Sequence, residues 1–304
     1  MDLSIVIVNW RTRDFLAECL KSVFSSKLDR NFEVLVVDNC SNDGSVELIN
    51  DQFPEVHLIA NSTNVGFARA NNQAIVKTSG QNILLLNPDT ILKNDAIDLM
   101  VEYLTLEPGV GVVGPRLLNP DGTLQISAFP EPTLQREFWR MFHLDEVHHY
   151  AEYPMDEWSI EAEKEVDVLM GACFLVRRKV LDQVGLLDGD FFVYSEEVDL
   201  CTRIREFGWR LIWLPTAEVI HFGGQSTQQV SQKMFLQLYQ GKVQYFRKHH
   251  STPEVWLYKF VLLLATLARL MLTPFAYLES FSKNGELLGL IKNYRQLLQV
   301  LPKL

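Results

Sequence analysis

The sequence contains little cysteine, and none of it has a metal-binding or redox spacing. Its four cysteines, Cys19, Cys40, Cys173 and Cys201, are scattered over 304 residues without a CxxC pair. They predict reduced thiols in a cytosolic environment, and not a disulfide framework or a zinc site. The sequence also lacks an obvious repeat period and a low-complexity tract, and its hydrophobic content of 47% is ordinary for a globular chain.

Several targeting and ligand-binding signatures are also missing. There is no GxGxxG fingerprint and no P-loop, which disfavours generic dinucleotide or ATP binding. The N-terminus has no basic region and no cleavage site, so we expect no secretory signal. The most apolar stretch, residues 255–278, is interrupted by Lys259 and Arg269, so no uncharged run reaches the roughly 18–20 residues of a membrane-spanning helix.

Negative charge dominates the first three quarters of the chain and positive charge dominates the rest. Residues 227–304 contain ten Lys and Arg against three Glu, a net charge of +7, so residues 1–226 carry −17 of the total of −10. An acidic body does not suit nucleic acid but would suit a divalent cation, whereas the basic tail suggests a different partner.

Apolar runs of strand length alternate with amphipathic segments of helix length from residue 3 to about residue 113. This pattern predicts an α/β fold with a parallel sheet covered by helices. The expected strands are 3–8, 33–39, 56–60 and 82–86, and the expected helices follow them, one of them over 66–80 and stopped by Gly80. A loop, a helix and a strand are expected over 191–215, and the body ends near residue 226.

Polar side chains follow four of these strands in succession. They are Asn9, Asp38, Asn64, and the pair Asn87 and Asp89. Ligands of such sheets bind at the carboxyl ends of the strands, near the point where strand order reverses. One polar strand end is ordinary loop chemistry, but four together favour a site.

Each motif also has a structural explanation. Asp38 could accept the imino N–H of a pyrimidine base, or it could form an Asx-turn with a helix cap. Gly66 and Arg69 at a helix start could face a diphosphate, or they could belong to a capped helix with a surface arginine. Asp89 could hold Mg²⁺ or Mn²⁺ on a nucleotide diphosphate, but aspartate is also common in proline turns.

Two later motifs carry the remaining candidates. Glu196, Glu197 and Asp199 could supply a general base for an acceptor hydroxyl, or they could stabilise the dipole of a helix that Ser195 caps. His221 follows a strand, and it becomes a candidate metal ligand only if Asp89 lies close to it.

Taken together and in this order, the motifs resemble those of the family 2 glycosyltransferases, inverting enzymes with the GT-A fold that use nucleotide-sugars. The resemblance covers about residues 3–226, and "GPRLLNPDGTLQISA" (114–128) with "NVGFARANNQAI" looks most like bacterial rhamnosyltransferases. The matching stretches are "SIVIVNW", "VVDNCSNDGS", "NVGFARANN", "LLLNPD", "GACFLVRR", "YSEEVDLCTR" and "HFGGQS".

The resemblance implies roles for these residues. Asp38 would contact the base, Asn87 would face the ribose in place of the first Asp of a DxD motif, and Asp89 would hold the metal together with His221. The family's base is usually the Asp of a Glu-Asp pair, which here is Glu196-Glu197, so the role passes to Glu197, with Glu196 and Asp199 as alternatives. The residues expected to bind the nucleotide-sugar are Asn9, Asp38, Asn64, Gly66, Arg69 and Asn87.

The implied activity is metal-dependent inverting transfer of a hexosyl group, with Mg²⁺ or Mn²⁺ as cofactor. The implied donor is dTDP-rhamnose or a UDP-sugar, and the acceptor is a glycan or a lipid-linked hydroxyl in bacterial cell-surface polysaccharide synthesis. We expect a GT-A domain over 1–226, with a nucleotide-binding half (1–115) and an acceptor half (116–226). Two rivals stay open: a GT-A-like nucleotidyltransferase, and a non-catalytic nucleotide-sugar-binding scaffold at the membrane.

The tail, residues 227–304, is expected to form basic amphipathic helices. On a helix over 255–278, Lys259, Thr266 and Thr273 recur every seven residues beside Arg269, which gives a narrow polar stripe on a wide apolar surface. This pattern predicts a helix lying on the anionic inner face of the cell membrane. The alternative is a helix packed on the body or on a second subunit, which would give a homodimer.

Overall fold

The chain forms two compact units. The computed structural model describes residues 1–26, 28–226, 228–279 and 284–304, without the side chains of 228, 273–279 and 284–288. The first unit contains residues 1–131 and 154–226, and the second contains residues 132–153 and 227–304. Residues 132–153, which we expected in the acceptor half of the first domain, therefore belong with the C-terminal helices.

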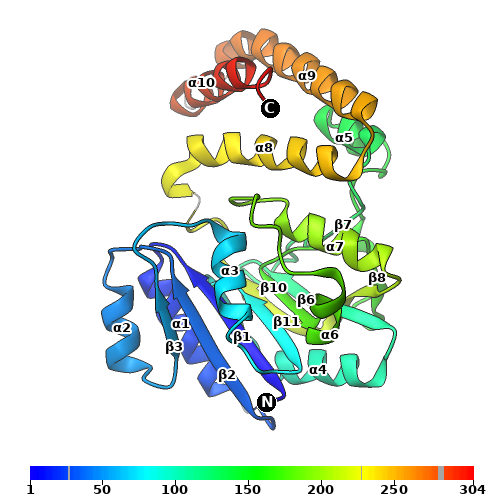
Figure 1. Ribbon diagram of the computed structural model, residues 1–304. Helices are drawn as coiled ribbons and strands as arrows, with labels where there is room; N and C mark the ends of the chain where they lie inside the picture. The colour runs from blue at the N-terminus through cyan, green and yellow to red at the C-terminus, as the bar shows by residue number, and fades with distance from the viewer. Residues whose placement is uncertain (27, 227, 280–283) are drawn as a thin grey trace. The chain divides into compact units, whose positions relative to one another are not determined.

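A nine-stranded mixed sheet is the centre of the first unit (Figure 1). Its order is β3-β2-β1-β4-β10-β6-β11-β5, with β8 paired to β11. The pairings make β1, β2, β3, β4, β6 and β11 run in one direction and β5, β8 and β10 in the other. The predicted mostly parallel sheet is thus confirmed, with antiparallel β10 inserted between β4 and β6. The strands are β1 (Leu3–Asn9), β2 (Phe32–Asp38), β3 (His57–Ala60), β4 (Asn82–Leu86), β5 (Thr90–Leu92), β6 (Val110–Leu118), β8 (Lys164–Glu165), β10 (Cys173–Arg177) and β11 (Arg210–His221).

Helices cover both faces of this sheet. Alternate residues of β1, such as Ile5 and Ile7, pack with buried residues of α1, α2 and α4 in the main hydrophobic core, while α3 crosses the opposite face over β1 and β2 (Figure 1). Helix α3 ends at Ile75, before the predicted stop at Gly80. The helices of this unit are α1 (Arg13–Ser25), α2 (Ser45–Gln52), α3 (Phe67–Ile75), α4 (Ala96–Leu106), α6 (Arg178–Val184) and α7 (Glu196–Glu206), and a small second sheet pairs β7 (Ala128–Phe129) with β9 (Val168–Leu169).

The strand order reverses beside β1. Strands β2 and β3 extend the sheet on one side of β1, and β4 lies on its other side. Asn9 pairs in register with Asp38, and Ile7 pairs with Leu86, so the carboxyl ends of β1, β2 and β4 are adjacent. In open α/β sheets this is where ligands bind.

The second unit is built from α5 (Leu134–Met141), α8 (Ser231–His249), α9 (Thr252–Glu279) and α10 (Asn284–Val300), with 3₁₀ turns at Leu144–Glu146 and Gln228–Val230. A further 3₁₀ turn, Met155–Glu157, lies in the first unit. A buried carboxylate, Glu137 of α5, forms ion pairs with Lys242 of α8 and with Arg140. Burial raises the pKa of Glu137, but the two cations outweigh it and the net pKa is lowered. The rings of Phe246 and Tyr258 stack at 4.2 Å and join α8 to α9.

Helix α9 turns its polar stripe inward, opposite to the predicted orientation. Lys259 and Thr266 are 8% and 0% exposed, and Arg269 donates a hydrogen bond to the carbonyl of Met141. Thr273, the third member of the stripe, lies outside the described side chains. The large exposed side chains of α9 are instead apolar: Trp256, Leu257, Phe260, Leu264, Met271 and Leu272. Thr266 donates to the carbonyl of Leu262 within α9, and Lys259 lies over the ring of Trp256, also on α9. Arg269 finds its partners on neighbouring helices, at the carbonyl of Met141 on α5 and the ring of Tyr294 on α10.

Among the described residues, one helical segment, Thr252–Leu272, is long and apolar enough to cross a membrane by length and composition. Lys259 and Arg269 do not disqualify the segment by this criterion, whereas we expected these two side chains to rule out a membrane-spanning helix. A core helix of a protein without a membrane span would meet the same criterion of length and composition. In this segment, 39% is buried within the protein.

Candidate active site

Asn9 and Asp38 form a buried polar centre at the ends of β1 and β2. The Asn9 amide nitrogen lies 2.9 Å from Asp38 Oδ1, and its oxygen accepts a hydrogen bond from Thr12. The other Asp38 oxygen accepts from the backbone N–H of Ser41. Asp38 is therefore held in one rotamer at the strand end, with lone pairs remaining on both oxygens.

Asn64 is part of a second amide network, beside β2. Its side-chain oxygen accepts hydrogen bonds from Asn39 Nδ2 at 2.9 Å and from the backbone N–H of Gly66. Asn39 also accepts from the N–H of Val65. Asn64 thus fixes the turn into α3, and this is the role that its contacts show.

The start of α3 holds the loop that leads to α7. The N–H of Phe67 donates to the carbonyl of Phe192 at 2.7 Å, so it is not free to bind a phosphate. Arg69 donates to the carbonyl of Gly189 and lies 3.8 Å from Asp190. A Cβ on Gly66 would lie 2.7 Å from the Phe192 oxygen, and its φ of +90° also requires glycine.

Asp89 and His221 are brought together by the sheet. Antiparallel pairing of β5 with β11 aligns Thr90 with His221, and the N–H of Phe222 donates to the Asp89 carbonyl. His221 Nε2 then lies 3.4 Å from Asp89 Oδ1 and 3.5 Å from Asn87 Nδ2. The condition that we set for His221 as a ligand, proximity to Asp89, is therefore met.

Gln125 orients the imidazole. Its Oε1 lies 2.7 Å from His221 Nδ1, while its Nε2 donates to Asn119 Oδ1 and to the His221 carbonyl. Because the amide nitrogen is engaged by two acceptors, Oε1 must accept from Nδ1–H. Neutral His221 consequently presents the lone pair of Nε2 on the side of Asp89.

Glu196 and Glu197 begin α7 as two adjacent carboxylates, of which Glu196 is buried and Glu197 is half-buried. Burial raises the pKa of both, and the charge of Glu197 raises that of Glu196 further, whereas backbone N–H groups at the helix start oppose the rise at Glu197. One oxygen of each, Oε2, is buried without a hydrogen-bond partner. The preceding residues Tyr194 and Ser195 both have φ near +70°, a strained conformation for side-chain-bearing residues that is typical of functional sites.

Asp199 is engaged elsewhere. It is 0% exposed and forms an ion pair with Arg203, at 2.9 Å from two of the guanidinium nitrogens. Arg203 in turn donates to the carbonyls of Val184 and Leu186. Asp199 is therefore better explained as an anchor for the 184–186 loop than as a base, because its carboxylate is enclosed by this network.

Residues 171–172 connect the two halves of the site. The N–H of Asn87 donates to the carbonyl of Ala172 at 2.8 Å. A Cβ placed on the neighbouring Gly171 would lie 3.5 Å from Glu197 Cβ. The turn that carries Asp89 and the helix start that carries Glu197 are thus separated by one short segment of chain.

The donor set fits a divalent cation held in part by its substrate. Among the residues that the structure describes, no three His, Cys, Asp or Glu side chains converge. Asp89 and His221 supply one carboxylate and one imidazole, and Mg²⁺ and Mn²⁺ commonly complete such a shell with substrate phosphates. Two protein ligands therefore suffice.

Three further residues lie in or beside the site: Asn39, which shares the predicted polar strand end with Asp38, and Gln125 and Arg203, for which no role was predicted. Gln125 lies in the stretch "GPRLLNPDGTLQISA", but nothing in its neighbours marks it as the partner of His221. Gln125 acts through His221, 96 residues away, so a single sequence contains no signal for it. Arg203 lies four residues after Asp199 on one helix, and that spacing is a signal for an ion pair.

These features define a nucleotide-sugar transferase fold of the GT-A type, and comparison with known proteins gives the family. The family model "Glycosyl transferase family 2" matches residues 4–185. The chain belongs to this family, and it is a glycosyltransferase similar to rhamnosyltransferases.

Curated relatives extend over most of the chain. An N-acetylglucosaminyl-diphospho-decaprenol L-rhamnosyltransferase of Mycobacterium tuberculosis is 29% identical over 74% of this chain and 77% of its own length. Rhamnosyltransferase WbbL of Escherichia coli is 24% identical over 76% of this chain and 87% of its own length. Among solved structures, a mannosyltransferase from Pyrobaculum calidifontis in complex with GDP-Man and Mn²⁺ has a TM-score of 0.59 at 20% identity, covering 99% of this chain and 84% of that one. At this identity the structural likeness shows the fold.

Gly66→Ala should displace the loop that precedes α7. We expect destabilisation of about 2–4 kcal/mol, because the substitution adds a contact with the Phe192 oxygen to the strain of a left-handed φ. Gly122→Ala is the matched control, since Gly122 has φ +86° but open space around it. Urea unfolding of both variants measures the difference, and equal losses would show that the contact with Phe192 is unimportant.

Proposed function

We propose that this protein is a metal-dependent inverting glycosyltransferase in which Glu197 is the general base. The observation that carries the proposal is the short connection through residues 171–172 between the Asp89 turn and the Glu197 helix start. It brings a candidate diphosphate-metal site near a half-buried carboxylate with a raised pKa. A nucleotide-binding scaffold without catalysis would not need that carboxylate.

In the proposed reaction, Asp38 accepts a hydrogen bond from the base of the donor, and Asn87 contacts the nucleoside. The acceptor hydroxyl gives its proton to the unpaired oxygen of Glu197 as its own oxygen attacks the anomeric carbon. The bond from that carbon to the diphosphate breaks in the same displacement, which inverts the anomeric centre. The nucleoside diphosphate leaves with the bonding electron pair.

A bound divalent cation would offset negative charge on the departing diphosphate. Asp89 and His221 would hold it, with Gln125 fixing the imidazole tautomer. Arg69 contacts the 189–190 loop, so its proposed part in diphosphate binding requires a change of rotamer when the donor is present. The buried surroundings of Asp89 and His221, each less than 9% exposed in the side chain, strengthen charge interactions there.

The names of the relatives support a proposal for the donor and the acceptor. Proteins named as rhamnosyltransferases match more than two thirds of the chain, and one of them is named for a diphospho-decaprenol acceptor. We therefore propose transfer of L-rhamnose from dTDP-rhamnose to a lipid-linked glycan acceptor in cell-surface polysaccharide synthesis. The rival nucleotidyltransferase reaction would release pyrophosphate instead of a nucleoside diphosphate, so analysis of the released product distinguishes the two.

Replacing Glu197 by Gln should lower kcat by about 10²–10⁴-fold, because the amide cannot accept the hydroxyl proton. In the wild-type enzyme the base must be deprotonated, and burial raises its pKa above the ordinary 4.5. The value of kcat/KM should therefore rise with pH along a limb centred above 4.5, and the limb should disappear in Glu197→Gln. Glu196→Gln is the isosteric control. A larger loss in Glu196→Gln than in Glu197→Gln would move the base to Glu196.

Asp89→Ala should abolish the metal-dependent part of donor binding. With dTDP-rhamnose at a hundred times its Kd, the ligand should stabilise the wild-type protein by about 2.7 kcal/mol. We expect this gain to require Mn²⁺ or Mg²⁺, to vanish in Asp89→Ala and to be only reduced in Asn87→Ala. Thermal unfolding with and without EDTA provides the measurement. A gain that survives both EDTA and Asp89→Ala would contradict metal binding at this site.

We also propose that the second unit binds the cytoplasmic face of the membrane through α9. Its exposed side chains are apolar over several turns, Trp256 at 64% and Phe260 at 52% among them. The net charge of +7 over residues 227–304 would favour anionic lipid. An ordinary amphipathic helix on a membrane surface exposes its polar side chains to water. In α9, Lys259 and Thr266 are buried and the exposed face is apolar.

Phe260→Glu should weaken co-sedimentation with vesicles that contain phosphatidylglycerol, because it places a carboxylate in the apolar face. Leu106→Glu, at a 70% exposed position of α4 in the first unit, is the control and should bind as the wild type does. Equal binding of the two variants would contradict the proposed surface, and a change of oligomeric state in Phe260→Glu would favour the alternative of a homodimer.

A further inference from the structure

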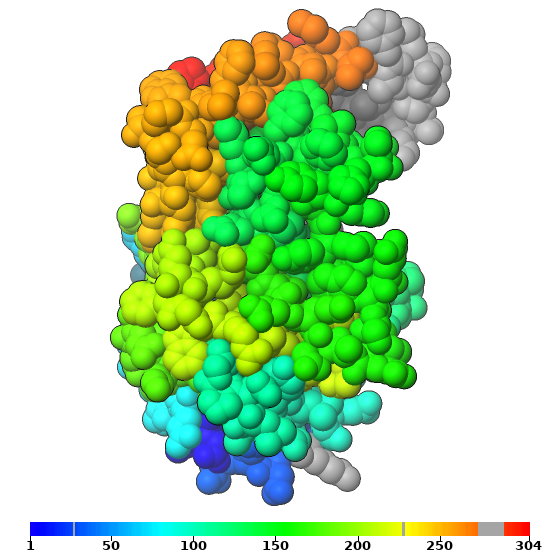
Figure 2. Space-filling view, turned by 90° about the vertical axis from the view of Figure 1, so that its right-hand side faces the viewer, coloured from blue at the N-terminus to red at the C-terminus, as the bar shows by residue number. Residues whose placement is uncertain are grey.

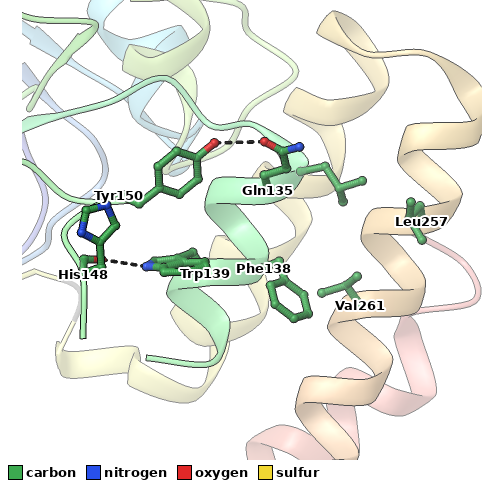
Figure 3. Close-up of a pocket in the computed structure, with 8 residues that line it drawn as sticks. Gln135, Phe138, Trp139, His148, Tyr150, Leu257 and Val261 are labelled. Carbon is green, nitrogen blue, oxygen red and sulfur yellow. Dashed lines mark hydrogen bonds between the residues drawn. The ribbon is translucent and has the colours of Figure 1, made fainter. Parts of the chain in front are cut away.

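The second unit contains an apolar groove that the transfer reaction does not use. It has a volume of about 540 Å³, within the usual range for ligand sites. One wall comes from α5 and the turn after it, and the other comes from α9, more than a hundred residues later in the sequence (Figure 3). Figure 2 shows these two segments in direct contact at the surface. The lining residues are Leu134, Gln135, Phe138, Trp139, His148, Tyr150, Leu257 and Val261.

Two polar groups of the aromatic wall, those of Trp139 and Tyr150, are paired within the wall itself. Trp139 Nε1 donates to the carbonyl of His148 at 2.9 Å, and the Tyr150 hydroxyl lies 3.0 Å from Gln135 Oε1 (Figure 3). The rings of Trp139 and Tyr150 meet edge to face, which fixes both orientations. With these polar groups paired, the groove offers carbon surface to a ligand, so it suits a hydrocarbon better than a ligand that needs hydrogen bonds.

Positive charge lies beside this hydrocarbon surface. The guanidinium carbon of Arg136 is 5.7 Å from the centre of the Tyr150 ring. On α9, the largely buried Lys259 places its Nζ 4.8 Å from the centre of the Trp256 ring, so the charge accessible beside the groove is that of Arg136. A ligand with a long apolar chain and an anionic head would therefore find complementary surfaces for both parts.

We propose that the groove binds the isoprenoid chain of a polyprenyl-diphosphate-linked acceptor, in the segment next to the diphosphate. The identity of the chain rests on the proposed function, whereas binding of an isoprenoid diphosphate by the groove rests on its lining and charge. Three lining side chains, those of Phe138, Tyr150 and Leu257, are 42%, 39% and 48% exposed, so the groove is open along its length. An open groove suits a chain whose far end stays in the bilayer.

The test is equilibrium binding of radiolabelled geranylgeranyl diphosphate to the full-length protein and to two matched variants. Leu257→Asp places a carboxylate in the groove, and Leu264→Asp makes the same change two turns further along α9. These side chains are 48% and 44% exposed, so neither change removes core packing, and Leu264 does not line the groove. We expect Leu257→Asp to weaken binding by about tenfold or more and Leu264→Asp to change it less than about twofold.

Two competitors identify the part of the ligand that is bound. Isopentenyl diphosphate has the same head group with one isoprene unit, and dihexanoyl phosphatidylglycerol offers acyl chains with an anionic head. Neither should displace the geranylgeranyl ligand at equal concentration. Displacement by isopentenyl diphosphate would show a head-group site, and displacement by the phospholipid would show an acyl-chain site. Either result would overturn the proposal.

The remaining outcomes also separate this inference from the proposed function. No binding to the wild-type protein, or equal loss in both variants, would overturn the groove assignment. A dimer that dissociates in Leu257→Asp would show that a second copy occupies the groove and would overturn it too. Donor binding, measured as metal-dependent thermal stabilisation by dTDP-rhamnose, should be unchanged in both variants. If the wild-type protein shows no donor binding, this result counts against the proposed function and does not affect the groove assignment.

Discussion

The pairing of β5 with β11 is the constraint on which the candidate active site depends. It is a short antiparallel contact, with Thr90 opposite His221, and it joins segments more than 120 residues apart. A slip of one residue would turn the His221 side chain to the other face of the sheet and separate it from Asp89. The contacts of Asn87 and Gln125 with the imidazole depend on the same register. Two metal-ligand candidates can thus be held by backbone hydrogen bonds, without a large cluster of charged side chains that would repel one another when no ligand is bound.

The other half of the site depends on a loop that α3 holds in place. Backbone and side-chain groups of α3 bind the carbonyls of Leu187, Gly189 and Phe192, and the chain then passes through two residues of positive φ into α7. The strain and the burial of one oxygen on each of two adjacent carboxylates both cost stability. The network of Arg203 with Asp199 and the 184–186 carbonyls offsets part of that cost, because it ties the first turns of α7 to the same loop. The motif "NVGFARANN" therefore holds the loop before the helix that carries Glu197.

In the second unit, helix α9 combines buried polar side chains with an exposed apolar face. It buries Lys259 and Thr266 and partly exposes Arg269. Thr266 and Lys259 find partners within α9, whereas Arg269 donates to the carbonyl of Met141 on α5. The ion pairs of Glu137 with Lys242 and Arg140 stabilise this arrangement from the inside. The aromatic groove and the outward apolar face adjoin on one helix: Leu257 belongs to both, and Leu264, two turns further along the same face, does not line the groove. A transferase with a lipid-linked acceptor would have a use for both.

The sequence by itself determined the alternation of strands and helices, the polar strand ends and the family, because these depend on local periodicity and on the order of short motifs. It also predicted Asp89 and His221 as possible neighbours. Only the tertiary structure decided that β10 enters the sheet antiparallel, that Asp199 is enclosed by Arg203, that Gln125 orients His221, and that residues 132–153 pack with the C-terminal helices. The polar stripe of α9 was visible in the sequence, but its inward direction was not. For β10, Gln125 and residues 132–153 the deciding partner is distant along the chain, and a residue's type and its immediate neighbours do not encode which distant group it will meet. Arg203 is only four residues from Asp199, and there the structure adds the contacts of Arg203 with the 184–186 loop.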